Sequence, residues 1–385
     1  MNQFDVIVVG GGLIGAAIAF ELASEKLRVV VLDRQEPGRE ASWAAAGMLS
    51  PGPDSPEALP LVPLAKESFR IYPEFINAME DASGMVVNYR REGTFEVFFG
   101  AHAEAERDEM IREYRRLELE IEAMPPDVAR KLEPSLGKDA RAVAWLPNEA
   151  TVDPRLLTRA ALAAVRQRSA EIRVGYAVES LVCAKRSCFG VIAGGERVGA
   201  ERVVLAAGSF CGTIKTSRDG RDGDLTRYAP VRPVRGQMIA LRSRTVELKK
   251  VLRSRNGYLV SRPGADIIAG STLEDAGFVK QVTPEGVAKI LAGVAELAPA
   301  LVDAEIVERW AGLRPGSPDH LPIIGPTDIE GLLIATGHYR NGILLAPATA
   351  KIVRDWIVSG KAEFSSEIFS PLRFTAARSR AESHR

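Results

Sequence analysis

A glycine-rich turn near the beginning of the chain constrains the fold more than any other feature. Gly10, Gly12 and Gly15 form a Gly-x-Gly-x-x-Gly pattern between an apolar run at 4–9, typical of a strand, and a stretch at 14–24, typical of a helix. Because glycine has no Cβ, these positions allow a sharp turn, close approach of the backbone to a pyrophosphate and tight helix–strand packing. The helix N-terminus would then face the anion. The pattern predicts a βαβ unit that binds a nucleotide.

The acidic residue that follows narrows the choice of nucleotide. A second apolar run at 28–32 leads into Asp33, which stands 18 residues after Gly15. At this place a carboxylate binds free ribose hydroxyls and would repel a 2′-phosphate. We therefore expect FAD or NAD and not NADP. Asp33 does not distinguish FAD from NAD.

Composition and charge favour a small-molecule partner. The chain has 385 residues, enough for two domains, and its 50 basic residues balance 50 acidic ones. This balance provides no global field that would attract nucleic acid or an anionic membrane. The uncharged stretch at 6–20 is too short to span a membrane, and no basic segment precedes it as a secretory signal requires. We expect no nucleic-acid partner and no membrane span.

The residues that usually carry metal or hydrolytic chemistry are sparse. Cys183, Cys188 and Cys211 are too few and too irregularly spaced for a disulfide framework or a zinc site, which favours a reducing cytoplasm. The four histidines form no His-Glu-x-x-His pattern and pair with no recognisable nucleophile. The sequence therefore predicts a cytoplasmic protein without a metal site.

The pattern of strands and helices predicts two interleaved domains. Five prolines within 51–63 end the first βαβ unit, an apolar strand at 202–208 returns to a parallel sheet, and strands at 234–274 leave it again. The polar stretch 216–227 is expected to be a loop. The nucleotide domain is predicted to comprise 1–50, 140–230 and 311–365, the substrate domain 51–139 and 231–310, and a polar tail 366–385.

Two further features favour a long cofactor such as FAD. The small residues at 41–48 suit a backbone that lies against a flat ring. A second strand–turn–helix, with its turn at 337–342, places another helix N-terminus where it would stabilise the negative charge of a reduced flavin. One such turn at each end of the chain suits a bipartite cofactor.

The chain resembles the FAD-dependent D-amino-acid oxidase superfamily, and within it glycine oxidases of the thiamin-pathway type. The matching stretches are 42–49, 231–238, 310–316 and 337–348. The resemblance implies an α/β fold, with an FAD-binding Rossmann-like domain of the glutathione-reductase type and a second α+β domain on an antiparallel sheet. It implies noncovalent FAD, because no cysteine stands near 314–317. The implied FAD-binding residues are Gly10, Gly12, Leu13, Ile14, Gly15, Asp33, Arg34, Ser42, Ala46, Gly47, Met48, Val178, His338, Tyr339, Arg340, Asn341, Gly342, Ile343 and Leu344.

The same resemblance implies a binding site for an amino acid. Arg314 matches an arginine that binds the substrate carboxylate, a task for which the planar guanidinium is well shaped. Tyr258 matches a tyrosine whose hydroxyl meets the same carboxylate, and Arg340 and Met48 are expected at the substrate. No residue is expected to act as a catalytic acid or base.

Two positions depart from the family pattern. Asn256 replaces a histidine and Leu273 replaces a methionine of the pocket, so both are expected to alter the pocket wall. These departures leave the preferred substrate open and do not touch the flavin chemistry.

The function that the resemblance implies is oxidation of glycine and other small amino acids, such as sarcosine and small D-amino acids. Hydride transfer from Cα to N5 of FAD would give an imine and then a 2-oxo acid and ammonia, and oxygen would be reduced to hydrogen peroxide. A homo-oligomer and a role in thiamin thiazole synthesis are also implied. The alternatives are a D-amino-acid dehydrogenase that reduces a quinone, an NAD-dependent dehydrogenase, and an inactive FAD-binding subunit.

Overall fold

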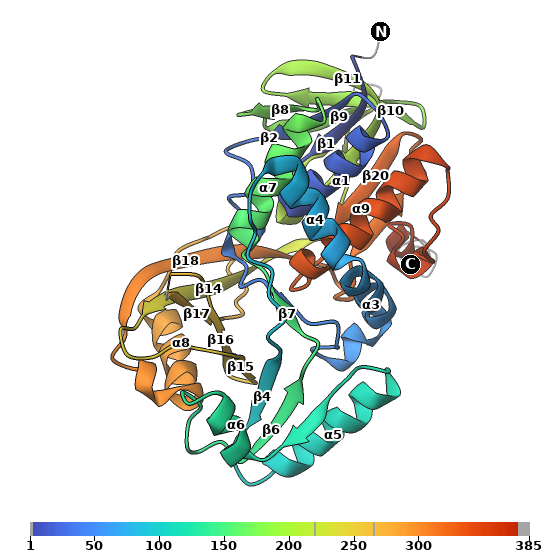
Figure 1. The fold of residues 1–385 in the computed structure, drawn as a ribbon. Helices are drawn as coiled ribbons and strands as arrows, with labels where there is room; N and C mark the ends of the chain where they lie inside the picture. The colour runs from blue at the N-terminus through green and yellow to red at the C-terminus, as the bar shows by residue number, and fades with distance from the viewer. Residues whose placement is uncertain (1–2, 219–220, 265, 376–385) are drawn as a thin grey trace, which may run out of the picture.

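A computed structural model describes residues 3–218, 221–264 and 266–375. It contains two large sheets joined by chain segments that cross between them several times (Figure 1). Both predicted parts of the fold are present: a mostly parallel sheet with helices, and a second sheet that is mainly antiparallel.

The first sheet is built around β1 (Phe4–Val9), as the glycine turn predicts. Its parallel neighbours are β2 (Val29–Asp33) and β11 (Glu196–Leu205), followed outward by β8 (Glu171–Val174) and β20 (Leu332–Thr336). β10 (Ser187–Ala193) pairs antiparallel with β11 and with β9 (Val178–Ala184), and β19 (Ile323–Pro326) pairs antiparallel with β20. The edge of the sheet is extended by β12 (Lys215–Arg218), parallel to β9, and β13 (Arg221–Asp224), antiparallel to β12.

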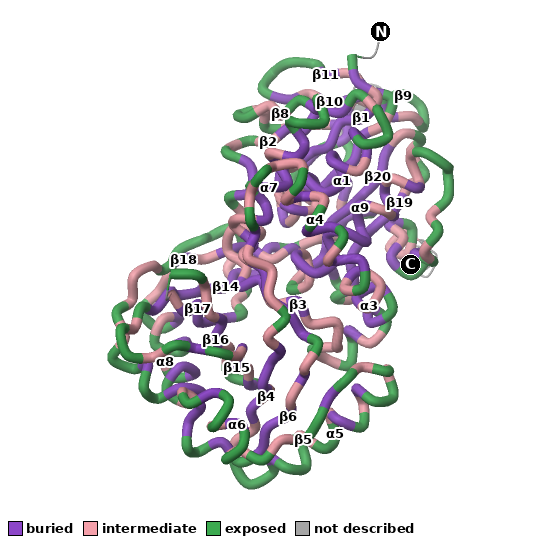
Figure 2. The backbone as a smooth tube through the Cα atoms, viewed as in Figure 1, coloured by how far each residue is buried: buried purple, intermediate pink, exposed green. Residues whose placement is uncertain are grey.

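The central strands are buried on both faces, as parallel strands usually are. Val6 and Val8 belong to a core shared with helices, whereas Ile7 and Val9 belong to a second core on the opposite face. Buried backbone is concentrated around β1, α1 and β20 (Figure 2). The helices of the first core are α1 (Leu13–Ser24), α3 (Val62–Arg70), α4 (Tyr72–Ser83), α7 (Pro154–Gln167) and α9 (Gly342–Val358).

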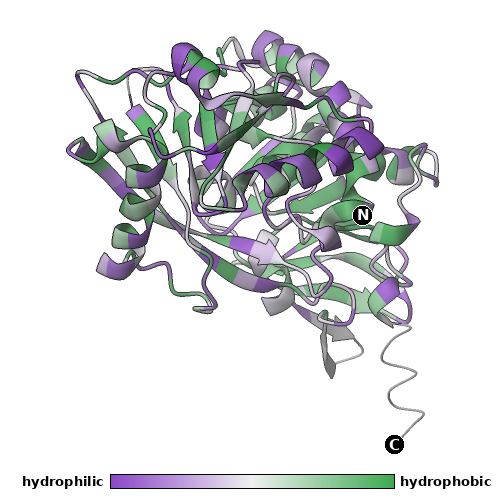
Figure 3. Ribbon diagram, turned by 90° about the horizontal axis from the view of Figure 1, so that it is seen from below, coloured by the Kyte–Doolittle hydropathy of each residue, from purple (hydrophilic) through white to green (hydrophobic). Residues whose placement is uncertain are grey.

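The second sheet has the order β18-β14-β17-β16-β15-β4-β6-β5. Its strands are β4 (Thr94–Phe98), β5 (Glu122–Met124), β6 (Ala142–Leu146), β14 (Arg232–Arg242), β15 (Val251–Ser254), β16 (Gly257–Ser261), β17 (Asp266–Gly270) and β18 (Glu305–Gly316). Helix α8 (Pro284–Leu297) covers it with Ile290, Val294 and Leu297, while α5 (Ala103–Arg116) and α6 (Pro126–Leu132) lie at its far end. Short elements α2 (Ala41–Ala44), β3 (Met48–Leu49) and β7 (Ala150–Thr151) run between the sheets, and apolar residues concentrate in the strands (Figure 3).

The predicted boundaries are wrong in three places. The boundary at 140 assigns β6 to the nucleotide domain, but β6 pairs with β4 in the second sheet. The boundary at 311 cuts β18, which pairs with β14 along its whole length to Gly316. Helices α3 and α4 belong to the core of the first sheet, because their buried apolar residues pack against α9 and α7.

Two polar stretches are also more ordered than predicted. The expected loop at 216–227 contains the paired strands β12 and β13, although 219–220 lie outside the described residues. The expected tail at 366–385 begins with a helical turn at Glu367–Phe369, and Phe369 is fully buried in the first core. Residues 376–385 lie outside the described residues. Among the described residues, no helix is long and apolar enough to cross a membrane.

Candidate active site

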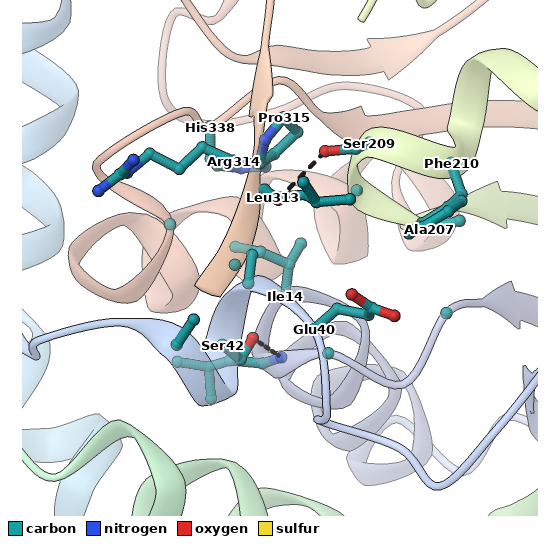
Figure 4. A pocket seen from close by; sticks show the side chains of 18 of the residues that line it. Ile14, Glu40, Ser42, Ala207, Ser209, Phe210, Leu313, Arg314, Pro315 and His338 are labelled. Carbon is teal, nitrogen blue, oxygen red and sulfur yellow. Dashed lines mark hydrogen bonds between the residues drawn. The ribbon is translucent and has the colours of Figure 1, made fainter. Parts of the chain in front are cut away.

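A cavity of about 430 Å³ lies where the two sheets meet. Its wall is formed by the first glycine turn, the small-residue segment after β2, the ends of β11 and β18, and the turn before α9. Figure 4 shows Arg314 extending away from β18 on one side, with Ala207, Ser209 and Phe210 on the other. The predicted residues that line the cavity are Gly10, Gly12, Leu13, Ile14, Asp33, Arg34, Ser42, Ala46, Gly47, Met48, Val178, Tyr258, Arg314, His338, Tyr339, Arg340, Gly342 and Ile343.

The glycine turn opens the nucleotide end of the cavity. Gly10 has φ of +101°, and a Cβ there would lie 2.7 Å from the carbonyl oxygen of Ala206. A Cβ at Gly15 would overlap the carbonyl oxygen of Gly10, so only glycine lets α1 approach the strand this closely. The amide of Leu13 donates to Oγ of Ser42 at 2.9 Å. These contacts fix the N-terminus of α1 against the cavity, where it favours an anion.

The carboxylate of Asp33 is held in place by backbone amides. Its Oδ2 accepts from Gly11 at 2.8 Å and its Oδ1 accepts from Gln35 at 3.1 Å. Burial raises the pKa of Asp33, and the two amides oppose that shift. The acid is therefore placed at the end of β2, as the sequence predicts.

Three side chains beside Asp33 form a polar and aromatic wall. The guanidinium of Arg34 lies 3.6 Å from the ring centre of Phe210 and pairs with Glu40 at 2.5 Å. Phe210, in the helical turn η2 (Gly208–Thr213) after β11, was not predicted. The only signal for it is the strand-terminating Ala-Ala-Gly at 206–208, which marks the carboxyl end of a parallel strand, where ligands bind in such sheets.

The small-residue segment has backbone donors without a protein acceptor. Within the described part of the chain, the amides of Ala45, Ala46 and Gly47 donate to no protein group, and all three residues line the cavity. Gly47 has φ of +87°, and a Cβ there would overlap the carbonyl oxygen of Val152. The segment is therefore a wall of small residues that offers hydrogen-bond donors to a ligand.

Arg314 lies at the opposite end of the cavity. Its Nη1 donates to the carbonyl oxygen of Thr272 at 3.2 Å and its Nη2 to Oγ of Ser271 at 2.8 Å. Among the described residues no carboxylate pairs with it, although burial lowers its pKa. An arginine stays protonated in a protein, so this guanidinium is a buried cation that lacks an anion.

The neighbours of Arg314 leave room for it and add a second polar group. Gly236 lies on β14 beside it, and a Cβ at that position would overlap Nη1. The hydroxyl of Tyr258, on β16, also lines the cavity and donates to Sδ of Met238 at 3.0 Å. Arg314, Tyr258 and Met48 are thus brought together as the sequence predicts, while Gly236, Met238 and Ser271 were missed as wall residues.

Arg340 lines the cavity, but its side chain has a protein partner. Its Nη1 lies 2.9 Å from Oδ2 of Asp54, and the side chain is 45% exposed. Arg340 is therefore a partly solvated ion pair at the edge of the cavity.

The turn before α9 is fixed by contacts on both sides. The amide of Tyr339 donates to the carbonyl oxygen of Pro315 at 3.0 Å, which joins this turn to the end of β18. The buried His338 ring shares a hydrogen bond with Oγ1 of Thr349 at 3.0 Å, and burial lowers its pKa to about 3. His338 is therefore neutral at physiological pH and engaged with α9.

Some sequence predictions do not fall on the cavity wall. Gly15, Asn341 and Leu344 lie behind it, in contact with the elements that form it. The expectation that Asn256 and Leu273 alter the pocket wall is wrong: Asn256 donates to Glu296 at 2.9 Å, and Leu273 is 58% exposed.

The residues present fit FAD. The two ends of the cavity combine an anion-binding helix N-terminus and a ribose-type carboxylate with a flat wall of small residues that carries free amides. NAD would fill the first end but would not explain the free amides at 45–47 or the second helix N-terminus at Gly342.

Comparisons with known proteins give the family. A family model described as FAD dependent oxidoreductase (DAO) matches residues 5–356. The chain is 33% identical to a glycine oxidase of Pseudomonas aeruginosa, over 92% of this chain and 95% of that protein. It is 36% identical to the bifunctional protein ThiO/ThiG of Trichormus variabilis over 93% of this chain, and it spans only 53% of that longer protein.

A solved structure agrees with these sequences. The crystal structure of glycine oxidase from Geobacillus kaustophilus superposes with a TM-score of 0.89 at 28% identity, and the match covers 97% of this chain and 99% of that one. The similarity therefore extends over both sheets and the cavity between them.

Proposed function

The chain belongs to the family of FAD-dependent oxidoreductases, and we propose that it is an oxidase of glycine and other small amino acids. The observation that carries the proposal is Arg314, a buried guanidinium without a carboxylate partner among the described residues, at the end of the cavity opposite the glycine turn. The similarity to glycine oxidases over nearly the whole chain supports the same substrate class.

In this proposal Arg314 binds the carboxylate of the substrate. Thr272 and Ser271 each accept from one terminal nitrogen of the guanidinium, and further N–H groups remain for a ligand. The hydroxyl of Tyr258 turns from Met238 toward the same carboxylate. With the carboxylate fixed, rotation of the amino acid is restricted and its Cα–H bond is aligned with the cofactor, which is the main requirement for hydride transfer.

Bound FAD would supply a two-electron oxidant that takes a hydride from the substrate Cα, with oxygen as the final electron acceptor. The products would be an imine, hydrolysed to a 2-oxo acid and ammonia, and hydrogen peroxide. The protein residues bind and orient the amino acid and exclude water. For the flavin we propose the cavity-lining residues named above, including Asp33, Ser42 and the amides at 45–47.

No described side chain near Arg314 is placed to take a proton. The nearby titratable residues that line the cavity are Tyr258, Tyr339 and Arg340, and His338 is neutral and bonded to Thr349. The substrate amine must therefore lose its proton to solvent before the hydride leaves. A homo-oligomer, a cytoplasmic location and a role in thiamin thiazole synthesis remain predictions from the sequence.

Two assays on the purified protein test the proposal. The cofactor released by denaturation should be FAD, and anaerobic glycine should bleach the flavin absorbance. Admission of air should restore the absorbance and yield hydrogen peroxide. If amino acids bleach the flavin but only a quinone restores it, the electron acceptor in the proposal is wrong.

A further inference from the structure

The backbone carbonyls of the small-residue segment are all bonded to groups outside the cavity. Nε of Arg155 donates to the carbonyl oxygen of Trp43 at 3.2 Å, and Nε1 of Trp310 donates to that of Ala44 at 3.2 Å. Nη2 of Arg262 donates to the next carbonyl oxygens, those of Ala45 and Ala46, at 3.3 and 3.2 Å. The amide of Val152 donates to the carbonyl oxygen of Gly47 at 2.9 Å.

This arrangement explains why the amides at 45–47 are free. In a planar trans peptide bond the N–H of one residue points opposite to the carbonyl of the residue before it. The carbonyls of Ala44, Ala45 and Ala46, held by donors outside the cavity, therefore leave the amides of the next residues on the opposite side. The amides of Ala45, Ala46 and Gly47 meet no protein acceptor among the described residues, yet their residues line the cavity. Unpaired donors are costly when buried, so a sequence that keeps three of them together implies a ligand with acceptors.

Among these donors, Arg262 is the one that holds two successive carbonyl oxygens, those of Ala45 and Ala46. It follows β16, and its side chain is only 10% exposed. Its Nη1 lies 2.6 Å from Oδ1 of Asp153, the residue that caps α7 by accepting from the amides of Arg155 and Leu156. Arg262 does not line the cavity, and its contacts with the cavity wall are through the backbone carbonyls of Ala45 and Ala46. A buried cation that holds two successive carbonyls makes charge-assisted hydrogen bonds, which are about twice as strong as neutral ones.

We propose that Arg262, assisted by Trp310, is a positioning residue that orients the free amides of 45–47 toward the flavin and thereby raises its reduction potential. The inference rests on the FAD of the proposed function but not on the identity of the amino-acid substrate. Donors that are fixed on the cavity wall stabilise the added negative charge of the reduced cofactor more than they stabilise the oxidised form. Arg262 acts on this balance through the backbone that it holds.

Three variants of the full-length holoenzyme test the proposal. Arg262→Gln removes the positive charge and leaves one terminal nitrogen in place of two. Trp310→Phe keeps an aromatic ring and removes the indole N–H that donates to Ala44. Arg90→Gln is the matched control, because Nη2 of Arg90 donates to the carbonyl oxygen of Ser261, next to Arg262, and does not reach the small-residue segment.

The measurements are the dissociation constant of FAD, by fluorescence titration of the apoprotein, and the reduction potential of bound flavin, by equilibration with a reference dye. We expect Arg262→Gln to weaken FAD binding about tenfold and Trp310→Phe about threefold. In both variants the reduction potential should become more negative, because the reduced form loses more affinity than the oxidised form. Arg90→Gln should leave the potential unchanged.

The outcomes separate positioning from a purely structural role. A structural residue would change thermal stability and the affinity for both redox forms equally, and the potential would stay at the parent value; that result would overturn the proposal. If Arg262→Gln does not fold, Trp310→Phe decides by the same criterion. The variants could show the expected changes in FAD affinity and reduction potential while glycine fails to reduce the flavin of the parent. That result would contradict the proposed substrate and leave the role of Arg262 standing.

Discussion

Replacement of Arg314 by alanine should remove most of the specificity for amino acids while FAD stays bound. The guanidinium sits at the end of the cavity opposite the glycine turn, and its hydrogen bonds to Thr272 and Ser271 are with neutral groups. Nothing else that is described in that end of the cavity is a cation without a partner, because Arg340 is paired with Asp54. A substrate carboxylate in the variant would therefore be desolvated without a counter-charge.

The size of the loss follows from the cost of an unpaired charge in such a site. Removal of one partner from a buried, hydrogen-bonded ion pair costs about 2–5 kcal/mol, which corresponds to a roughly 30- to several-thousand-fold fall in kcat/KM. The kcat/KM of Arg314→Lys should lie between those of Arg314→Ala and the parent, because an ammonium keeps the charge but lacks the planar guanidinium geometry. KM should rise more than kcat falls, because the carboxylate is bound before and during the reaction.

The assay is the rate of anaerobic flavin reduction as a function of glycine concentration, with methylamine as a substrate that lacks the carboxylate. The parent should strongly prefer glycine over methylamine, and Arg314→Ala should lose that preference. Arg242→Gln is a suitable control, since Arg242 lies on the same sheet, pairs with Asp266 at 2.8 Å and is 51% exposed. If Arg314→Ala reduces its flavin with glycine as efficiently as the parent, the assignment of the carboxylate site is wrong.

Three other predictions test the environment of this site. Gly236→Ala should raise KM for glycine without weakening FAD binding, because the added Cβ overlaps Nη1 of Arg314; an unchanged KM would show that the guanidinium has room to move. Because no described residue takes the proton of the amine, kcat/KM for glycine should rise about tenfold per pH unit below the pKa of the amine, and a flat profile would contradict this mechanism. His338 has a folded-state pKa of about 3 against 6.5 in the unfolded chain. Its contribution to the free energy of unfolding is therefore fully present above pH 6.5 and is lost as the pH falls toward 3, by about 2 kcal/mol at pH 5. Urea unfolding at pH 7 and pH 5 should show that loss in the parent and a smaller one in His338→Gln, and equal losses would assign it to other groups.

The sequence predicts the central layers of this fold because their physical signals are local. A β-branched strand, a turn that only glycine can form and an apolar helix identify the βαβ unit at 4–33, and the strand–turn–helix at 332–358 repeats the pattern. The apolar run at 203–205, which ends β11, is fully buried, as expected for a strand inside a parallel sheet.

The domain boundaries depend on contacts that no local signal reports. Strand β6 has the same apolar character as the strands of the first sheet, and only its pairing with β4 places it in the second. Helices α3 and α4 follow a proline-rich exit, yet they return to cover the first core. Phe369 stands in a polar stretch and is buried because the chain folds back onto the sheet.

Sequence proximity to a site residue is a poor guide to the cavity wall. Asn256 is two residues from Tyr258 but lies in the turn between β15 and β16, where its side chain bonds to α8. Leu273 follows Ser271 and Thr272, which hold Arg314, and faces solvent instead. Conversely, Phe210 lines the cavity because it follows the end of β11, and Gly236 because β14 pairs with β18 beside Arg314.

The most direct test of the central claim is the anaerobic titration of the purified flavoprotein with glycine, followed by air. If the cavity holds FAD at one end and an amino-acid carboxylate on Arg314 at the other, glycine should bleach the flavin, and oxygen should restore it with formation of hydrogen peroxide. A protein that contains FAD and keeps its oxidised spectrum with glycine, sarcosine and small D-amino acids would contradict the account.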